Sequence, residues 1–305
     1  MPLDGLSNGP LSGLNTKRNA MIPIIAKGTS AYSGTSYDVD AYNYIRKLQD
    51  TPGVILPEAW KRAINKFYVR LKQIGAYDQI DIMYLFIGGN AAAHKLEGKN
   101  PGGSYDIVWN GGVTHSVNGV TGGANGNSTA YGNTNFNIST NARAFVQANA
   151  SMGIYIRSNG GFYPIGVSTA TSGDPLLSGN GAFVGSFGTS GANLSGIMNN
   201  LIINGSINTA ITSPRGFLVI NRTGNISGTF RGFRRGYPVG TPPAVTSAAP
   251  VNLNVYVTSV NRNGTAYGSS STISFAYVGS GRINTMGMAI LVDNLQQALG
   301  RSVYT

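Results

Sequence analysis

The sequence contains no cysteine and only two histidines among its 305 residues. The absence of cysteine excludes disulfide frameworks, thiolate zinc sites and cysteine nucleophiles. Two histidines are too few for a metal centre built from several imidazoles. Charged residues make up only 11% of the chain, which excludes a coiled coil or an array of solvated helices. No apolar run approaches the roughly 18 residues that span a bilayer, so we expect no membrane partner.

Acidic residues and lysines are scarce in the second part of the chain. All lysines lie at or before Lys99, and from Ile107 onward the only acids are Asp174 and Asp293, against ten arginines. The formal net charge of +11 favours acidic partners. The uneven charge divides the chain into a conventional first region and a second region that is almost free of carboxylates.

Glycine, asparagine and aromatic residues are abundant instead. The chain has 43 Gly, 31 Asn, 16 Tyr and 11 Phe. So many aromatic side chains have to be buried or stacked, which argues against a disordered chain. This composition is typical of a turn-rich β protein with a sizeable core.

Residues 1–36 form the first of three predicted segments, an extended N-terminal arm. The arm is rich in Gly, Ser, Asn and Pro and has no sustained hydrophobic period. Its apolar residues Ile22, Ile24 and Ile25 are candidate docking residues, which would add an edge strand to a neighbouring subunit. The alternative is a frayed terminus. The apolar run is too short, and too far from the start, for a signal peptide.

Residues 37–100 form the second segment, which we expect to be a helical docking segment. A first helix is predicted over residues 38–49, capped by Ser36 or Asp38. A second helix begins with Pro57 as its first helical residue. Its apolar stripe consists of Trp60, Ile64, Phe67, Leu71 and Ile74. The basic candidate docking residues off this stripe are Lys61, Arg62, Lys66 and Arg70.

Residues 101–305 form the third segment, predicted to be a β-sandwich of the jelly-roll type that ends in a helix. Short runs rich in Val, Ile, Phe and Tyr recur between Gly/Asn/Ser turns, which is typical of an antiparallel sandwich. The predicted strands are 105–109, 144–147, 153–157, 162–167, 182–187, 216–221, 229–234, 253–260 and 272–278. Residues 117–141 are predicted to be a long loop or a loosely ordered strand connection, and residues 288–299 a closing helix stopped by Gly300.

The β-sandwich prediction makes glycoside hydrolysis the enzyme class to consider. That chemistry normally needs two carboxylates that face one site. From Ile107 onward Asp174 and Asp293 are the only acids, and no strand there carries a pair. Neither His94 nor His115 has an acidic neighbour in sequence that could orient it as a base. We therefore expect no enzymatic activity, and no catalytic residue is predicted.

A candidate ligand surface interleaves arginine with aromatic residues at Arg231, Arg234, Arg235 and Tyr237. Such a surface can stack bases or sugars and pair with phosphate. The alternative is one strand with arginines that face solvent, because a period of two sends them to opposite faces. No cofactor is predicted. Asn, Asp and backbone oxygens leave a calcium site open, but the sequence does not identify its ligands.

Several short motifs, in order along the chain, resemble a family of bacteriophage proteins. The motifs are Asp40-Ala41-Tyr42, Ala63-Ile64-Asn65, Tyr77-Asp78, Asn261-Arg262-Asn263-Gly264, Ile273-Ser274-Phe275-Ala276 and Leu299-Gly300-Arg301. Together they resemble the laminin-G-like, concanavalin A-type jelly-roll proteins of tailed bacteriophages. The resemblance extends over roughly residues 37–301, and residues 111–141 align poorly.

The resemblance implies a virion structural protein on the exterior of the phage particle. It would be a tail component (fibre or receptor-facing) or a capsid-exterior component (decoration or head fibre). Its partners would be other virion proteins and copies of itself, and we do not expect nucleic acid. The alternative is a carbohydrate-binding lectin for adhesion to host-surface glycans, with the candidate platforms Tyr131, Tyr163, Tyr237 and Tyr256. A glycan-cleaving enzyme is the third hypothesis, which requires a role for Asp174.

Overall fold

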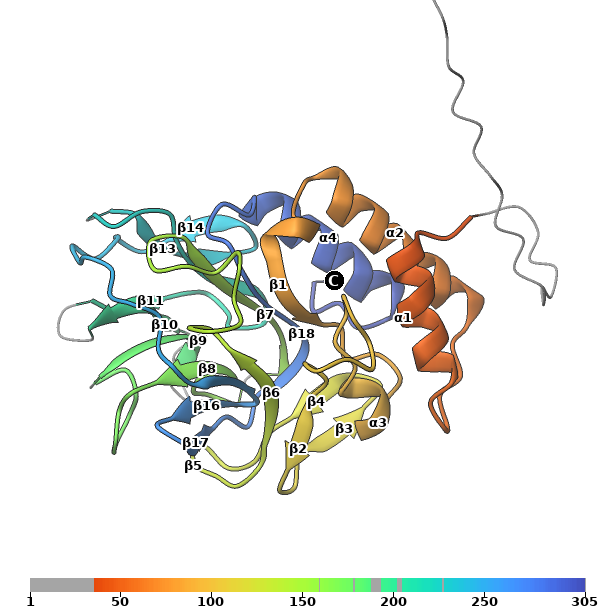
Figure 1. Cartoon of the computed structure of the whole chain (residues 1–305), viewed down its shortest axis with the longest axis horizontal. Coiled ribbons are helices and arrows are strands. Elements are labelled where there is room, and N and C mark those ends of the chain that lie inside the picture. Colours follow the sequence, from red (N-terminus) through yellow and green to blue (C-terminus); the bar gives the residue numbers. More distant parts are fainter. Residues whose placement is uncertain are drawn as a thin grey trace, which may run out of the picture. The chain divides into compact units, whose positions relative to one another are not determined.

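The computed structural model describes residues 36–158, 160–177, 179–187, 193–201, 205–226 and 228–304. Tyr37–Thr305 form one compact unit, separate from Met1–Ser36. The predicted arm, with Ile22, Ile24 and Ile25, lies outside the described residues. Within the compact unit, two β-sheets lie face to face and helices cover one of them (Figure 1).

The sheet that the helices cover, sheet A, has the strand order β14-β13-β12-β7-β18-β4-β3, with β1 also paired to β18. Its strands are β1 (Ile80–Tyr84), β3 (Thr114–Ser116), β4 (Gly119–Thr121), β7 (Ala150–Ser158), β12 (Gly216–Arg222), β13 (Phe230–Arg234), β14 (Tyr237–Val239) and β18 (Thr272–Gly279). Because β1 lies within residues 37–100, that segment contributes a strand to the sandwich as well as helices.

The second sheet, sheet B, has the strand order β11-β10-β9-β8-β15-β6-β2, with β16, β17 and β5 beside it. Its strands are β2 (Val108–Asn110), β5 (Gly126–Asn127), β6 (Tyr131–Asn137), β8 (Ile165–Ser168), β9 (Asn180–Phe187), β10 (Asn193–Leu201), β11 (Ile207–Ala210), β15 (Asn254–Val257), β16 (Ser259–Arg262) and β17 (Thr265–Gly268). Among the described strands, the pairing of β16 with β8 is parallel and the other pairings are antiparallel. The predicted fold class, a mainly β antiparallel jelly-roll sandwich with helices, is therefore confirmed.

Four helices belong to the compact unit: α1 (Val39–Gln49), α2 (Glu58–Gln73), the short α3 (Ala91–His94) and α4 (Thr285–Ala298); a 3₁₀ turn, η1, spans Tyr77–Gln79. Asp38 caps α1 with its side chain. Pro57 is the N-cap of α2 and not its first helical residue, because its ψ of 147° is extended. The side chains of Ile64, Phe67 and Leu71 are buried as predicted, whereas Ile74 is at the exposed end of the helix.

Three apolar clusters follow from the alternation of side chains along the strands. On β7, Ile154 and Ile156 point into the core between the sheets, while Tyr155 points to the helices. On β9, Val184 lies between the sheets, while Phe183 lies on the outer face of sheet B. The order of layers is helices, sheet A, central core, sheet B and a small outer aromatic cluster.

Three strand predictions differ from the structure. Residues 144–147 form no strand, because the Asp81 carboxylate accepts the backbone N–H groups of Arg143, Ala144 and Phe145. The single predicted strand 253–260 is divided into β15 and β16 at Thr258, whose φ is +62°. Residues 117–141, predicted to be a long loop or a loosely ordered strand connection, contain β4, β5 and β6, and β6 lies between β15 and the edge strand β2 of sheet B.

Candidate interaction surface

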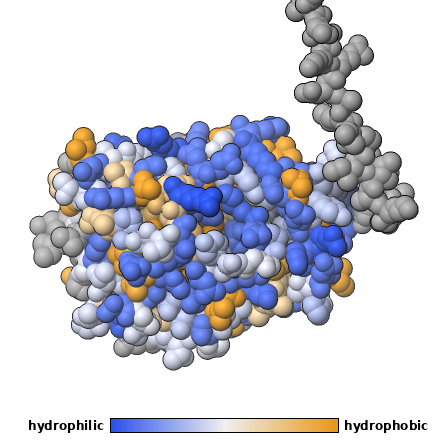
Figure 2. Space-filling model, in the orientation of Figure 1, coloured by the Kyte–Doolittle hydropathy of each residue, from blue (hydrophilic) through white to orange (hydrophobic). Residues whose placement is uncertain are grey.

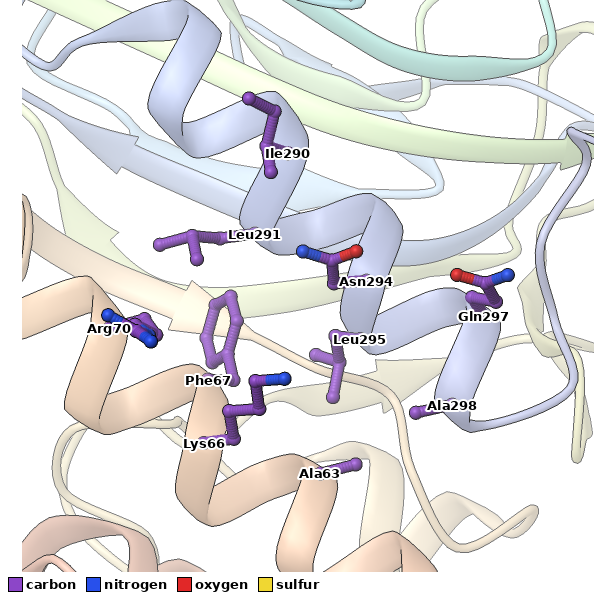
Figure 3. Close-up of a pocket in the computed structure, with 10 residues that line it drawn as sticks. All are labelled: Ala63, Lys66, Phe67, Arg70, Ile290, Leu291, Asn294, Leu295, Gln297 and Ala298. Carbon is purple, nitrogen blue, oxygen red and sulfur yellow. The ribbon is translucent and has the colours of Figure 1, made fainter.

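A groove lies between α2 and α4 in the helical layer (Figure 3). Both helices bury one face against sheet A, and Phe67 packs edge-on against Phe275 of β18 at 5.9 Å between ring centroids. Where their outer faces diverge, a volume of about 530 Å³ is left. We call this the docking groove; its lining is Ala63, Lys66, Phe67, Arg70, Ile290, Leu291, Asn294, Leu295, Gln297 and Ala298.

The docking groove has apolar walls and a cationic edge. Ile290 is 52% exposed, although it is a large apolar side chain. Lys66 and Arg70 project from α2 along the edge, and none of the described residues that line the groove is an Asp or a Glu (Figure 3). Arg70 donates one hydrogen bond, from Nη1 to Oε1 of Gln73, at 2.8 Å. The groove therefore offers apolar contact next to positive charge that no acid of its lining neutralises.

The four predicted basic docking residues fall into two pairs. Lys66 and Arg70 line the docking groove. Lys61 and Arg62 lie at the start of α2, where Nζ of Lys61 is 3.3 Å and Nη1 of Arg62 is 3.9 Å from the Glu58 carboxylate. Helical periodicity in the sequence placed all four residues off the apolar stripe. It did not show that Glu58 forms ion pairs with both Lys61 and Arg62.

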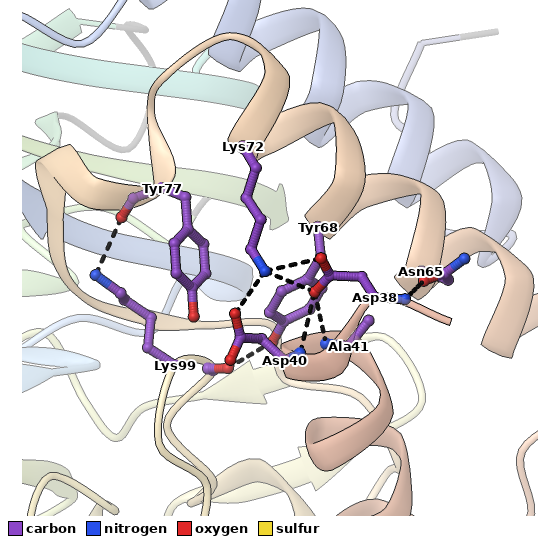
Figure 4. Close-up of polar contacts among 9 residues, drawn as sticks. Asp38, Asp40, Ala41, Asn65, Tyr68, Lys72, Tyr77 and Lys99 are labelled. Carbon is purple, nitrogen blue, oxygen red and sulfur yellow. Dashed lines mark hydrogen bonds and ion pairs between the residues drawn. The ribbon is translucent and has the colours of Figure 1, made fainter. Parts of the chain in front are cut away.

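A polar cluster fixes α1 on α2 (Figure 4). Nζ of Lys72 lies 2.7 Å from the Asp38 carboxylate and 2.6 Å from that of Asp40. The backbone N–H of Asp38 donates to the side chain of Asn65, and Lys72 lies 4.9 Å from the ring centre of Tyr77. Hydrogen bonds and the Lys72 ammonium lower the pKa of Asp38, although its partial burial acts in the opposite direction. The cluster gives α2 a rigid support on the side away from α4.

The predicted ligand surface around Arg231 is a hairpin of β13 and β14 and not one strand. Arg234 pairs with Tyr237, and the two loop residues, Arg235 and Gly236, both have positive φ (+55° and +83°), as a type I′ turn requires. The guanidinium of Arg235 stacks on Tyr304, 3.2 Å from its ring centre. Arg234 donates to Thr212 and Arg231 to the Gly228 carbonyl. The hairpin thus places the three guanidinium groups against three different neighbours.

The four candidate tyrosine platforms have different surroundings. Tyr163 is fully buried in the outer cluster of sheet B, and Tyr237 is 64% exposed on the hairpin. Tyr131 and Tyr256 stack at 4.3 Å between ring centroids with an angle of 18° between their planes. Both point away from the central core, because their strand neighbours Gly132 and Val257 face it. Of the four tyrosines, only these two rings stack on each other, and Tyr131 is partly exposed whereas Tyr256 is 7% exposed.

Asp174 and Asp293, the two acids from Ile107 onward, lie on opposite faces of the sandwich. Asp174 contacts Tyr163, 3.5 Å between Oδ2 and the hydroxyl oxygen, on the outer side of sheet B. Asp293 belongs to α4, on the outer side of sheet A, where burial raises its pKa to about 6. The two sheets and the central core separate them, so they cannot act as the two carboxylates of one glycosidase site.

The two histidines of the chain contact each other. Nδ1 of His94 lies 3.2 Å from Nδ1 of His115, and Nε2 of His94 accepts the N–H of Gly89. His94 therefore carries its proton on Nδ1 and donates it to His115. Burial, and then repulsion from His115, lower the pKa of His94 to about 3. This contact could not be predicted from the sequence, because 20 residues separate the two histidines.

Within the described ranges, no three His, Asp or Glu side chains gather in a group that could hold a metal ion. Across the same residues, no helix is both long and apolar enough to cross a membrane. The groove walls on α4, Ile290 and Leu291, were not predicted as interaction residues. The one sequence feature that indicated an interaction here is Ile290, an apolar residue that lies off the apolar stripe of the closing helix.

No protein-family model and no curated protein matches this sequence. Among solved structures, the IT-sialidase CBM40 of Ruminococcus gnavus is similar with a TM-score of 0.34 at 14% identity, covering 49% of this chain and 83% of that chain. Domain 4 of AbnA, an extracellular GH43 arabinanase from Geobacillus stearothermophilus, has a TM-score of 0.33 at 12% identity, with coverages of 70% and 98%. The binding domain of Botulinum Neurotoxin DC has a TM-score of 0.39 at 12% identity, with coverages of 72% and 52%.

Proposed function

We propose that this chain is a non-enzymatic structural component of a bacteriophage particle, attached to another particle protein through the docking groove. The observation that carries the attachment is the exposed apolar groove with Lys66 and Arg70 on its edge. The resemblance of residues 37–301 to tailed-phage jelly-roll proteins supports the setting. The opposite side of the unit, the outer face of sheet B, would then point away from the particle.

The chemistry of the groove defines its partner as an acidic segment with large apolar side chains. Apolar residues of the partner would cover Ile290 and Leu291, and its carboxylates would pair with Lys66 and Arg70. A symmetric contact between two copies would instead bring Lys66 and Arg70 against the same cations of the copy. We therefore propose that the groove binds a different protein. The self-association expected of a virion component would use other surfaces of the chain.

The substitution Ile290→Glu is expected to reduce incorporation of the chain into particles by at least about tenfold, because it places a carboxylate in the apolar centre of the contact. Leu177→Glu is the matched control, since Leu177 is 76% exposed beside Asp174, on the other side of the sandwich. The measurement is quantitative mass spectrometry of purified particles, with thermal melting of each free variant to check folding. Equal incorporation of both variants would contradict the attachment.

A non-enzymatic role agrees with the positions of the sandwich carboxylates, which lie on opposite faces. Asp174 is the residue on which the glycan-cleaving hypothesis depends, and burial raises its pKa. It is held by the backbone N–H of Leu176 at 2.8 Å and faces Tyr163, not a second acid. We propose that Asp174 stabilises the loop over the outer aromatic cluster.

Glycan binding on sheet B is the second candidate function, favoured by the stack of Tyr131 on Tyr256. Asn133 is opposite Tyr256 in the β6–β15 register, and Asn254 is opposite Asn137, so amide side chains surround the aromatic pair. Amides that bind hydroxyl groups, next to an aromatic ring that packs against the apolar face of a sugar, are a common combination in ligand sites.

Replacing Tyr131 by alanine is expected to weaken binding to host polysaccharides at least about tenfold, because the partly exposed ring that stacks on Tyr256 is lost. Tyr237→Ala is the control, since Tyr237 is more exposed but lies on sheet A. A glycan array followed by titration of the best ligand measures the effect. Silence of the wild-type chain across host polysaccharides would eliminate this candidate and leave the docking proposal intact.

A further inference from the structure

Arg157, at the end of β7, has buried hydrogen-bond donors with no acceptor. Its atoms Nε and Nη1 are shielded from solvent, and neither has a hydrogen-bond partner. Strand alternation puts its side chain on the outer face of sheet A, the side of Tyr155. Buried guanidinium donors normally have hydrogen-bond acceptors. Two donors of Arg157 that no described residue accepts are therefore available to a bound ligand.

Two further arginines surround this position. Gly216 of β12 pairs with Ile156 of β7, and continuation of this register puts Arg215 opposite Arg157. Burial lowers the pKa of Arg157, and repulsion from Arg215 adds to the effect. The buried Arg301 donates to the carbonyls of Leu85, Phe86 and Ser274, so its charge is present but its Nη groups are already used.

The residues after Arg301 form a fixed wall beside the arginines. The hydroxyl of Tyr155 accepts the N–H of Val303, and that of Tyr304 accepts the N–H of Phe217. Gly216 permits this contact, because a Cβ there would overlap the Tyr304 hydroxyl. These hydrogen bonds fix Val303 and Tyr304 against sheet A. Neither residue accepts a hydrogen bond from the side chain of Arg157 or Arg215.

Among the described residues, no salt bridge joins an acid to Arg157 or Arg215. Asp293, on α4, interacts with Tyr155 and Arg235. From Ile107 onward the chain has ten arginines and two acids, so the excess of arginine is not balanced within the sandwich.

We propose that Arg157 and Arg215 bind an oxyanion, either the carboxylate of an acidic sugar or a phosphate group. Arg157 would donate through its guanidinium N–H groups, as guanidinium groups do to carboxylate and phosphate, and Arg215 would approach from the exposed side. The site is separate from the docking groove and does not depend on the proposed function. The proposal assigns an oxyanion ligand to two of the arginines whose acidic partner the sequence did not identify.

The test uses the full chain with two probes, sodium phosphate and sodium glucuronate, titrated against sodium chloride of equal ionic strength. Calorimetry and thermal melting are the readouts, because a bound ligand raises the melting temperature. Phosphate binding alone assigns the site to phosphate groups, and glucuronate binding alone assigns it to acidic sugars. If neither probe has an effect beyond that of chloride, the proposal is overturned.

Arg157→Met is expected to weaken binding of the responding probe at least tenfold without lowering the melting temperature in chloride, because the side chain makes no hydrogen bond to lose. A structural arginine would behave in the opposite way. Arg215→Met, at an exposed position, should also weaken binding and serves if Arg157→Met does not fold. Arg282→Met, another exposed arginine, is the control. Equal affinity of wild type, Arg157→Met and Arg215→Met would overturn the assignment.

Discussion

Replacing Arg222 by methionine is expected to lower the free energy of unfolding by about 3–5 kcal/mol. Arg222 is fully buried at the end of β12, on the side of Leu218 and Ile220, and so lies between the two sheets. Its guanidinium stacks over Phe230 at 5.1 Å from the ring centre, and burial lowers its pKa to about 10. The group therefore stays charged at neutral pH inside the sandwich.

Hydrogen bonds to oxygens compensate this buried charge, since no carboxylate of the described residues forms an ion pair with it. Nε donates to the Met198 carbonyl at 2.8 Å, Nη1 to the Val245 carbonyl at 3.3 Å, and Nη2 to Oδ1 of Asn200 at 3.2 Å. Methionine retains much of the apolar stem but removes the donors that these acceptors bind, although Oδ1 of Asn200 still accepts the N–H of Met198 at 3.2 Å. Two of them are backbone carbonyls, which no side-chain substitution removes.

Chemical denaturation of Arg222→Met and of Arg231→Met measures the effect. Arg231 pairs with Asn221 on the neighbouring strand but is exposed, so its substitution is expected to change stability by less than about 0.5 kcal/mol. Equal stability of the two variants would show that the bonds of Arg222 do not hold the sheets together.

Acid is expected to destabilise the protein through His94, by about 3 kcal/mol at pH 4.5. The pKa of His94 is about 3 in the folded chain, against 6.5 for an exposed histidine. The unfolded chain therefore binds the extra proton between these values. The stabilisation is complete above pH 6.5 and decreases as the pH falls toward 3. A proton on His115 would add to the loss, because its Nδ1 could no longer accept from His94.

Other groups change in the same pH range, so a variant must isolate the histidine. Burial raises the pKa values of Glu97 and Asp293, which favours the folded state in acid and opposes the effect. Urea unfolding of wild type and His94→Gln at pH 7, 5.5 and 4.5 gives the difference directly. We expect the wild type to lose more stability than the variant over this range, and parallel pH profiles would contradict the role of His94.

The helices and the central strands could be predicted because their apolar periods are strong. The stripe of α2 and the β-branched and aromatic runs of β12 and β18 each specify one buried face. Strand β6 was missed because its inward positions are Gly132, Thr134 and Phe136, so two of the three are not apolar residues. Gly132 is needed there because a Cβ would overlap Ile107, Trp109 and Val257.

The interaction surface could be predicted only in part. The basic face of α2 was visible from helical spacing, but the docking groove needs α4, more than 200 residues later in the chain. Arginine is normally a surface residue, and nothing in the sequence distinguishes the buried Arg222 from the exposed Arg231. The unpaired donors of Arg157 likewise depend on the surroundings that the fold creates. The face of the unit in Figure 2 is mostly hydrophilic with scattered apolar residues, so hydropathy alone does not identify an interaction site.

Photo-cross-linking on intact phage particles tests the central claim most directly. A photo-reactive amino acid replaces Ile290 in the docking groove or, as the control, Leu177 on the outer side of sheet B, and mass spectrometry identifies the adducts. We predict that position 290 forms a covalent adduct with a different particle protein, in a segment that carries acidic residues, and that position 177 does not. Absence of the chain from particles, or adducts at position 177 in place of position 290, would contradict attachment through the groove.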